Sequence, residues 1–348
     1  MNRKRITTVI ILALIAFSIY RAQSVSSKSS SVNKTSYLMG TIVNLTIYDP
    51  LEDNLFSESF DIIEDIESKM SLNIDDSEVN SINKNPGVPV PVSDETIDVI
   101  ERGLYYSEVS GGKFDITSGS LVKLWDIGGE NAKVPSEEEI AAVLPSIDYK
   151  SVKVDRTENT VTLLKPGTTL DLGGIAKGYA ADAVSEYLKS KGVKKAIVDI
   201  GGNLFLIGTN EEDELWKVGI KNPFSESRND YIGIVESSES SVVTSGVYER
   251  FLESDGVKYH HILDPDTGYP SDNEIMGVSI ICDKSIDADG LSTSVFLLGL
   301  EDGIDLVEGL DGVEAIFITK SKEVYLTSGI SDAFELKNSE FKIIKRGS

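Results

Sequence analysis

The chain has 348 residues, of which 40% are apolar and 26% are charged, enough for one large or two modest domains with a sizeable core. Its formal net charge of −24 argues against nucleic acid as a partner, because binding to a phosphate backbone depends on lysine and arginine. An anionic nucleotide would need local cations or a divalent metal ion to offset the acidic surroundings.

The N-terminus has the pattern of an export signal. Basic residues at positions 3–5 precede an apolar run, 6–20, and a serine-rich segment follows. An uncleaved membrane anchor is the alternative, because the run is slightly short for a spanning helix and Ala22-Gln23-Ser24 is a poor cleavage site. Either way the positive charges predict an extracytoplasmic body, membrane-anchored or secreted, at the cell surface or in the periplasm. We expect residues 1–34 to be this signal or anchor with its tether, and 35–348 to be the folded domain.

Helices are expected where apolar residues recur every three or four positions, and strands where they alternate. In chain order the first half predicts one strand over 37–48, a helix over 55–70, a polar loop over 71–85, a helix over 93–106, a short helix opened by a capping box at 136–139 and ended by Pro145, and a hairpin over 151–164.

The second half predicts a helix after residue 174 that ends at Gly192, followed by more strands than helices. The expected strands are 195–200, 216–220, 231–235, 241–244, 315–319 and 323–327, and the expected late helices are 289–300 and 303–310. Strands and helices do not alternate strictly and no repeat is visible, so we predict an α+β fold of mixed, largely antiparallel sheets with packed helices in a single body.

The only cysteine, Cys282, lies in an apolar run over 278–282 that is typical of a strand. No intramolecular disulfide is possible, so an exported body would depend on its core for stability. The apolar neighbours favour a buried structural thiol over a nucleophile.

The stretch from Asp171 to Asp182 carries the strongest local pattern. An acidic residue closes an extended run, two glycines turn the backbone, and a helix begins with Lys177 in its first turn. Backbone amides at a helix N-terminus and glycines without side chains allow a phosphate or a hydrated metal ion to approach closely. We interpret this turn as the site for the phosphate end of a nucleotide.

A second cluster, 287–293, lies where a late helix is expected to begin. Asp289 and Thr293 are four residues apart, so their side chains share a face on a helix. A carboxylate, a hydroxyl and a backbone carbonyl are ligands of the kind that Mg²⁺ takes, with water and substrate phosphate completing the octahedron. The alternative, which residue chemistry alone favours, is that Asp289 merely caps this helix.

The two histidines, His260 and His261, are adjacent and follow the segment 244–250. Neighbouring strand residues point to opposite faces, so the two rings cannot readily hold one ion together. One ring could face a pocket as a base while the other packs or meets solvent. Alternatively, both are surface residues of a strand beside the turn at 264–268.

The glycine pair in 199–203 is weak evidence of a second phosphate or ribose loop, since a tight structural turn explains it equally well. Neither glycine pair in the chain fits a G-x-G-x-x-G dinucleotide fingerprint or a Walker A loop. A cysteine-rich metal site and a G-x-S-x-G nucleophile elbow are also missing from the sequence.

Together these separated motifs resemble the ApbE family, the FAD:protein FMN transferases. The resemblance extends from residue 37 to about residue 299, nearly the whole expected body. The motifs that carry it, in the expected order, are Met39-Gly40-Thr41, Phe114-Asp115-Ile116-Thr117-Ser118-Gly119, the stretch 171–182, Asp199-Ile200-Gly201-Gly202-Asn203, Thr244-Ser245-Gly246, His261-Ile262-Leu263-Asp264-Pro265 with Thr267-Gly268, and Asp289 with Thr293.

The resemblance implies that the FMN half of FAD is transferred, as a phosphoester, to a threonine or serine hydroxyl of an exported protein, with release of AMP. The implied partners are FAD and an acceptor with a Ser/Thr flavinylation motif, such as a membrane redox subunit. The implied cofactor is Mg²⁺.

The resemblance also implies a role for particular residues. The metal ligands would be Asp289, Thr293 and the carbonyl of Gly174, a position where relatives often carry alanine. His261 matches the histidine proposed as base toward the acceptor hydroxyl, with Asp289 as the other catalytic residue. The positions that match the FAD site are Met39, Thr41, Lys113, Phe114, Asp115, Asp171, Lys177, His261 and Ile262.

The sequence departs from the family pattern at Asn73, where many relatives have an aromatic residue beside the flavin. The smaller side chain leaves room for water at the pyrophosphate. Metal-dependent hydrolysis of FAD to FMN and AMP is therefore the alternative activity. A surface protein that binds flavin without catalysis is a third hypothesis, against which the intact Asp289, Thr293 and His261 argue.

Overall fold

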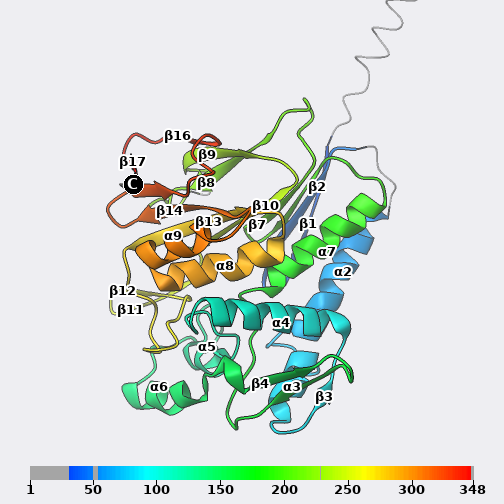
Figure 1. Ribbon diagram of the computed structural model, residues 1–348, viewed down its shortest axis with the longest axis vertical. Helices are drawn as coiled ribbons and strands as arrows, with labels where there is room; N and C mark the ends of the chain where they lie inside the picture. Colours follow the sequence, from blue (N-terminus) through cyan, green and yellow to red (C-terminus); the bar gives the residue numbers. More distant parts are fainter. Residues whose placement is uncertain (1–30, 50–53, 228, 346–348) are drawn as a thin grey trace, which may run out of the picture.

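The computed structural model describes residues 31–49, 54–227 and 229–345 (Figure 1). In this part of the chain the main sheet has nine strands, and every neighbouring pair is antiparallel except the last. In spatial order they are β1 (Val32–Leu38), β2 (Thr41–Ile47), β6 (Ala196–Ile200), β7 (Asn203–Ile207), β10 (Ser240–Gly246), β13 (Ile275–Cys282), β14 (Glu314–Thr319), β15 (Glu323–Leu326) and β17 (Lys342–Ile344).

Both faces of this sheet are covered, because its strands alternate two sets of buried side chains. Val43, Leu45 and Val243 belong to the core on the helical face, whereas Leu206 and Val242 belong to the core on the other face. The helical face packs against α2 (Leu55–Met70), α7 (Ala176–Ser190), α8 (Ser285–Leu298) and α9 (Leu300–Glu308), and the other face against a small sheet of β16 (Phe334–Leu336), β9 (Tyr231–Ser237) and β8 (Trp216–Lys221).

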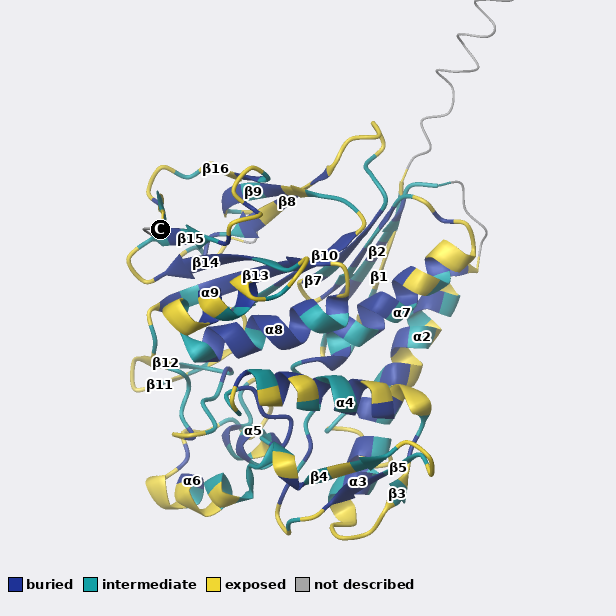
Figure 2. Ribbon diagram, in the orientation of Figure 1, coloured by how far each residue is buried: buried dark blue, intermediate teal, exposed yellow. Residues whose placement is uncertain are grey.

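A second group of elements lies beyond the helical layer, with α4 directly below α8 in the view of Figure 1. Its helices are α3 (Glu78–Lys84), α4 (Asp94–Val109), α5 (Gly119–Trp125) and α6 (Glu137–Val143), with the 3-10 turns η1 (Leu144–Ser146) and η2 (Tyr149–Ser151). Its sheet has the order β3 (Val90–Pro91), β5 (Thr160–Leu163), β4 (Val152–Asp155), and a separate hairpin pairs β11 (Phe251–Ser254) with β12 (Val257–His260). Figure 2 shows α8 almost wholly buried between these layers, whereas α6 is exposed.

Most predicted elements are confirmed, and so is the α+β class with largely antiparallel sheets. The helix 55–70 has its predicted bounds as α2, and the capping box at Ser136 and Glu139 opens α6. The predicted hairpin is β4–β5, and Cys282 is buried at the end of β13.

The prediction of one strand over 37–48 is wrong. Met39 and Gly40 have φ angles of 52° and 66°, so the chain turns through two left-handed residues and forms the hairpin β1–β2. A two-residue turn keeps the apolar alternation unbroken, which hides the hairpin in the sequence. β1 begins at Val32, so extended structure starts before the expected boundary at residue 35.

Two further predictions need correction. The polar segment 71–85 is not all loop, because Ser77 accepts a hydrogen bond from the Asn80 amide and caps the short helix α3. The late helix begins at Ser285 rather than at residue 289, which places Asp289 inside α8.

None of the described helices is long and apolar enough to cross a membrane. The predicted signal or anchor, with its apolar run 6–20, lies outside the described residues.

Candidate active site

The turn before α7 is arranged by its own side chains. Asp171 Oδ1 accepts a hydrogen bond from the Gly173 amide at 2.8 Å, and the Leu172 carbonyl accepts from Ile175 and Ala176. Burial raises the pKa of Asp171, and nearby cations, Lys177 first among them, oppose that rise. The Asp171 carboxylate therefore fixes the backbone of this turn and lies near positive charges.

Gly174 lies under an aromatic ring. A Cβ at this position would be 2.9 Å from Cε2 of Phe114, which is tighter than ordinary contact, so the absent side chain lets the ring cover the turn. No described residue donates a hydrogen bond to the Gly174 carbonyl. The first backbone bond of α7 runs from the Tyr179 amide to the Ile175 carbonyl, and the Gly178 amide donates to Asp289 instead. The carbonyl predicted as a metal ligand is therefore available.

Asp289 does not cap its own helix, which excludes the simpler of the two predicted roles. It is 3% exposed in the second turn of α8, and its Oδ2 accepts a hydrogen bond from the Gly178 amide in the first turn of α7 at 2.9 Å. Its Oδ1 lies 3.5 Å from Lys177 Nζ. The buried carboxylate thus joins α8 to the cationic start of α7.

Thr293 lies one turn further along α8, beside two serines. Ser245 Oγ at the end of β10 is 2.8 Å from Ser292 Oγ and 3.4 Å from Thr293 Oγ1. Ser292 Oγ in turn donates to the Asp289 carbonyl. These hydroxyls form a small polar layer between β10 and the face of α8 that carries Asp289.

The available donors suit Mg²⁺ rather than a soft metal. The described residues contain no group of three or more His, Cys, Asp or Glu side chains that could hold an ion by themselves. One carboxylate, one hydroxyl and one carbonyl, from Asp289, Thr293 and Gly174, are hard oxygen donors. Mg²⁺ typically accepts such a partial set and fills the remaining positions with water and substrate phosphate.

His260 is engaged on both ring nitrogens. Its Nε2 lies 2.9 Å from the Ser271 carbonyl and must carry the proton there, while its Nδ1 accepts from the Ile262 amide. Burial lowers the pKa of His260, and its ring meets Phe296 edge-on. His260 is therefore the histidine that packs.

His261 has one free ring nitrogen. The Arg250 carbonyl accepts from the His261 amide at 3.1 Å and lies 3.3 Å from Nδ1, so Nδ1 carries the proton. No described residue bonds to Nε2. Burial, followed by the Arg250 cation, lowers the pKa of His261 to about 3, which leaves a neutral imidazole with a lone pair on Nε2.

The loop 113–115 contacts the site through two of its three residues. Phe114 covers Gly174 as described, and Lys113 Nζ forms ion pairs with Asp264 at 3.2 Å and Asp266 at 2.8 Å, in the turn after His261. Asp115 points inward instead, because its carboxylate accepts from the amide and hydroxyl of Thr117 and from the Tyr149 amide. This geometry gives Asp115 a structural role in shaping the loop.

Met39 lies in the β1–β2 turn, which is fixed to the histidine segment by Arg250. The Arg250 Nη2 group donates to the Gly40 carbonyl at 3.3 Å, while its carbonyl orients His261. Thr41 packs on the turn after β6, since a Cβ at Gly201 would lie 2.3 Å from Thr41 Oγ1. Ile262 is 4% exposed and belongs to the core.

Sequence reasoning assigned no role to Arg250 or to its neighbour Glu249. Glu249 is exposed, yet desolvation by the protein around its carboxyl raises its pKa to about 7, and the cations Lys177, Arg250 and Lys221 oppose that rise. The signal that could have found this pair is that two charged residues follow Thr244-Ser245-Gly246 after a gap of two residues, shortly before the histidines.

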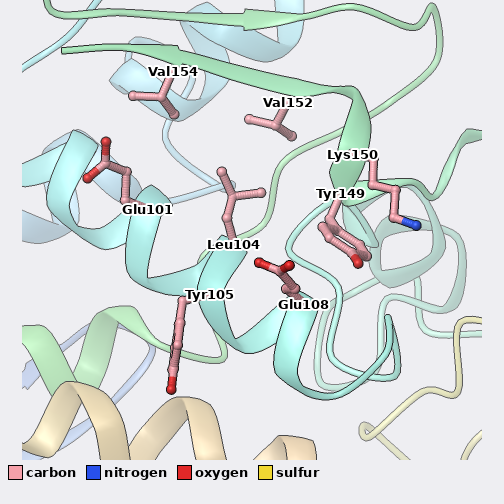
Figure 3. A pocket seen from close by; sticks show the side chains of 8 residues that line it. All are labelled: Glu101, Leu104, Tyr105, Glu108, Tyr149, Lys150, Val152 and Val154. Atoms are coloured by element: carbon pink, nitrogen blue, oxygen red, sulfur yellow. The ribbon is translucent and has the colours of Figure 1, made fainter.

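A groove of about 450 Å³ on the outer side of α4 contains none of the predicted site residues (Figure 3). Leu104 and Val152 form its floor, and Glu108, Tyr149 and Lys150 lie at one end. It is connected to the site only indirectly, through the Tyr149 amide that holds Asp115.

A family model decides the relationship that this geometry suggests. The model described as the ApbE family matches residues 39–317, which includes every predicted site residue. The chain belongs to the ApbE family.

Similar proteins agree with this assignment over most of their length. A FAD:protein FMN transferase of Klebsiella pneumoniae is 38% identical over 88% of this chain and 95% of its own, and one of Treponema pallidum is 36% identical over 89% and 90%. Among solved structures, the ApbE protein of Thermotoga maritima has a TM-score of 0.80 at 32% identity, and the flavin transferase ApbE of Vibrio cholerae has 0.79 at 29%. Each of these two matches covers 87% of this chain and 99% of the chain in the solved structure.

Proposed function

We propose that this ApbE-family chain is a FAD:protein FMN transferase that depends on Mg²⁺. It would transfer the FMN half of FAD to a serine or threonine hydroxyl of an acceptor protein and release AMP. The observation that carries the proposal is the arrangement of a neutral His261, whose Nε2 bonds to no described residue, and a glycine turn at the start of α7 with Asp289 and Lys177 beside it.

His261 supports the base role by its tautomer. With Nδ1 committed to the Arg250 carbonyl, Nε2 can accept the proton of the acceptor hydroxyl. The hydroxyl oxygen then forms a bond to the FMN-side phosphorus, the bond from that phosphorus to the bridging oxygen breaks, and AMP leaves with that oxygen. General-base assistance of this kind typically contributes about 10²-fold to 10⁴-fold in rate.

The remaining residues would bind and neutralise charge, which is most of what phosphoryl transfer asks of a protein. Lys177 supplies a cation at the start of α7, where the helix dipole also favours phosphate. Asp289, Thr293 and the Gly174 carbonyl would hold Mg²⁺, which offsets the negative charge of the pyrophosphate when bound. These local positive charges counteract the acidic chain as a whole.

Hydrolysis of FAD is the second candidate, and Asn73 is the observation that favours it. Asn73 is exposed in the loop after α2, where its backbone N–H donates to Ser71 Oγ at 3.2 Å. A short exposed polar residue there leaves water access that an aromatic side chain would restrict. Water would then replace the acceptor hydroxyl in the same step.

We further propose an extracytoplasmic location, with the chain that precedes β1 as a signal or membrane anchor and its tether. The sequence pattern supports it: basic residues precede an apolar run and a serine-rich segment. The acceptor would then be an exported protein with a Ser/Thr flavinylation motif, such as a membrane redox subunit.

The test is incubation of residues 31–348 with FAD, Mg²⁺ and a purified candidate acceptor. Covalent flavin fluorescence on the acceptor together with AMP is the result expected of a transferase. AMP and free FMN without labelled acceptor would indicate hydrolysis. FAD that is bound but chemically unchanged would indicate a flavin-binding protein without catalysis.

Two variants separate the roles within the site. We expect Asp289→Ala to lose the Mg²⁺ dependence of turnover, and an unchanged dependence would overturn the metal assignment. We expect His261→Ala to slow transfer by about 10²-fold or more while FAD still binds. Equal losses of FAD affinity and rate would instead make His261 a binding residue.

A further inference from the structure

Helices α7 and α8 exchange carboxylate caps where their N-terminal ends meet (Figure 1). Asp289 of α8 accepts from the Gly178 amide of α7 at 2.9 Å. In the opposite direction, Asp182 of α7 accepts from the amides of Ser285 at 2.8 Å and Ile286 at 2.9 Å, in the first turn of α8. Each helix thus satisfies backbone donors that the other leaves unpaired.

The two helices are in backbone contact at this crossing. A Cβ on Gly178 would lie 2.2 Å from the Ser285 carbonyl oxygen and 2.7 Å from the Ile286 Cα. Both carboxylates are withdrawn from water, with Asp182 7% and Asp289 3% exposed. The relative position of α7 and α8 is therefore set by these bonds and has little room for adjustment.

The two carboxylates differ in what they leave free. Asp289 uses one oxygen for the cap and keeps the other near Lys177, in the candidate metal site. Asp182 uses one oxygen for each of two amides and contacts no predicted site residue. Any effect of Asp182 on the site must act through the position of α8.

A second contact supports the first turn of α8 from a different helix. The Arg102 guanidinium of α4 pairs with Asp287 through its Nε. The α8 start is thus held by Asp182 from one side and by Arg102 from another, one turn before Asp289. Side chains that carry no metal would then determine where Asp289 and Thr293 stand relative to Gly174.

We propose that Asp182 is the positioning residue of the metal site: its double cap on α8 fixes Asp289 and Thr293 relative to the turn that carries the Gly174 carbonyl. This inference rests on the Mg²⁺ site of the proposed function. Metal–ligand distances tolerate deviations of only about 0.2 Å, so a small shift of α8 weakens binding. Mutation of supporting residues around metal sites typically costs 10-fold to 100-fold in affinity.

The test variant is Asp182→Asn, with Mn²⁺ alone as the probe, followed by electron paramagnetic resonance of the free ion. The amide offers one acceptor oxygen for two donors, so at least one cap bond is lost. We expect the Mn²⁺ dissociation constant to rise about 10-fold. We also expect the Mg²⁺ concentration for half-maximal FAD turnover to rise in parallel, with kcat recovering at saturating Mg²⁺.

Asp49→Ala is the control. Asp49 also accepts from two consecutive amides, of Lys194 and Lys195, both at 2.7 Å, but at the end of β2 far from the Met39 turn. Both amides share the single oxygen Oδ2, so asparagine could still accept both bonds, whereas alanine removes them. Asp49→Ala should lose stability and bind Mn²⁺ as the wild type does. Equal loss of Mn²⁺ affinity in both variants, or none in Asp182→Asn, would overturn the positioning role.

Ser285→Pro keeps the inference testable if Asp182→Asn does not fold. Proline is tolerated at the first position of a helix, and Lys284 before it is already extended, so the substitution removes one cap donor with little helix cost. Weaker Mn²⁺ binding supports the inference and unchanged binding overturns it. A wild type that binds no Mn²⁺ would instead refute the metal site of the proposed function.

Discussion

Gly178→Ala is the sharpest test of the helix crossing, because the substitution adds a single methyl group where two backbones touch. The new Cβ would lie 2.2 Å from the Ser285 carbonyl oxygen, about 1.2 Å short of the 3.4 Å at which ordinary contact begins. The neighbour is backbone and cannot rotate away, so α7 and α8 must separate.

The magnitude follows from opposing contributions. Alanine favours a helix over glycine by about 1 kcal/mol. Overpacking costs about 1–3 kcal/mol, and the separation stretches the 2.9 Å bond from Gly178 to Asp289 beyond hydrogen-bond reach, at about 1.5–3 kcal/mol for a charged acceptor. We expect a net loss of about 2–4 kcal/mol in the free energy of unfolding, measured by urea denaturation, with weaker Mn²⁺ binding.

Gly103→Ala provides the comparison. Gly103 is also helical and closely packed, but its added Cβ would meet a side-chain methyl group, the Cγ2 of Ile116 at 2.6 Å, and not the backbone of a second helix. We expect a smaller loss of stability and unchanged Mn²⁺ affinity. If Gly178→Ala proves as stable as the wild type and binds Mn²⁺ equally well, the α7–α8 crossing is not the rigid element described above.

Two further predictions concern the surroundings of His261. Trp125 is fully buried, and its Nε1 donates to the Gly268 carbonyl at 2.8 Å. Trp125→Phe should therefore cost about 2–4 kcal/mol of unfolding free energy and lower the transfer rate more than the FAD affinity. An unchanged transfer rate despite that loss of stability would contradict a role of Trp125 in positioning the turn after His261. The pKa of Glu249 is raised from 4.5 to about 7, so the folded state keeps this proton to a higher pH than the unfolded state does. The stability of the wild type should therefore fall relative to that of Glu249→Gln as the pH rises from 4.5 to about 7. Parallel pH profiles of the two proteins in urea denaturation would refute this.

Local signals in the sequence were sufficient for much of the fold. The stripe of apolar residues gave α2 its bounds, and the reciprocal bonds of Ser136 and Glu139 gave the start of α6. The hairpin β4–β5 followed from β-branched alternation around a turn. In each case the residues that decide the structure are neighbours in the chain.

The errors occur where a distant group decides. α8 begins at Ser285 because Asp182, on another helix, caps its first amides, and nothing near residue 285 shows this. The β1–β2 turn uses Met39 at positive φ, which residue preferences do not favour. Both features depend on tertiary contacts that local patterns do not contain.

The candidate site shows the same division. The motifs assigned Lys177 and Asp289 to one site. The structure places Lys177 Nζ 3.5 Å from Asp289 Oδ1, although the two residues are more than a hundred positions apart in the chain. They could not show that the Asp115 carboxylate turns inward, or that the backbone carbonyl of Arg250 sets the tautomer of His261. The direction of a side chain and the role of a backbone group follow from the fold and cannot be read from the identity of the residue.

The hairpin β1–β2 also determines how far the site stands from the preceding chain. β1 begins at Val32 and delivers Met39 to the Arg250 contact at its other end, and its seven extended residues span about 20 Å. Because β1 is paired with β2 along its whole length, its extended conformation and its length are fixed. With the proposed anchor ahead of it, β1 would hold the Met39 turn about 20 Å from the point where the preceding chain enters the fold.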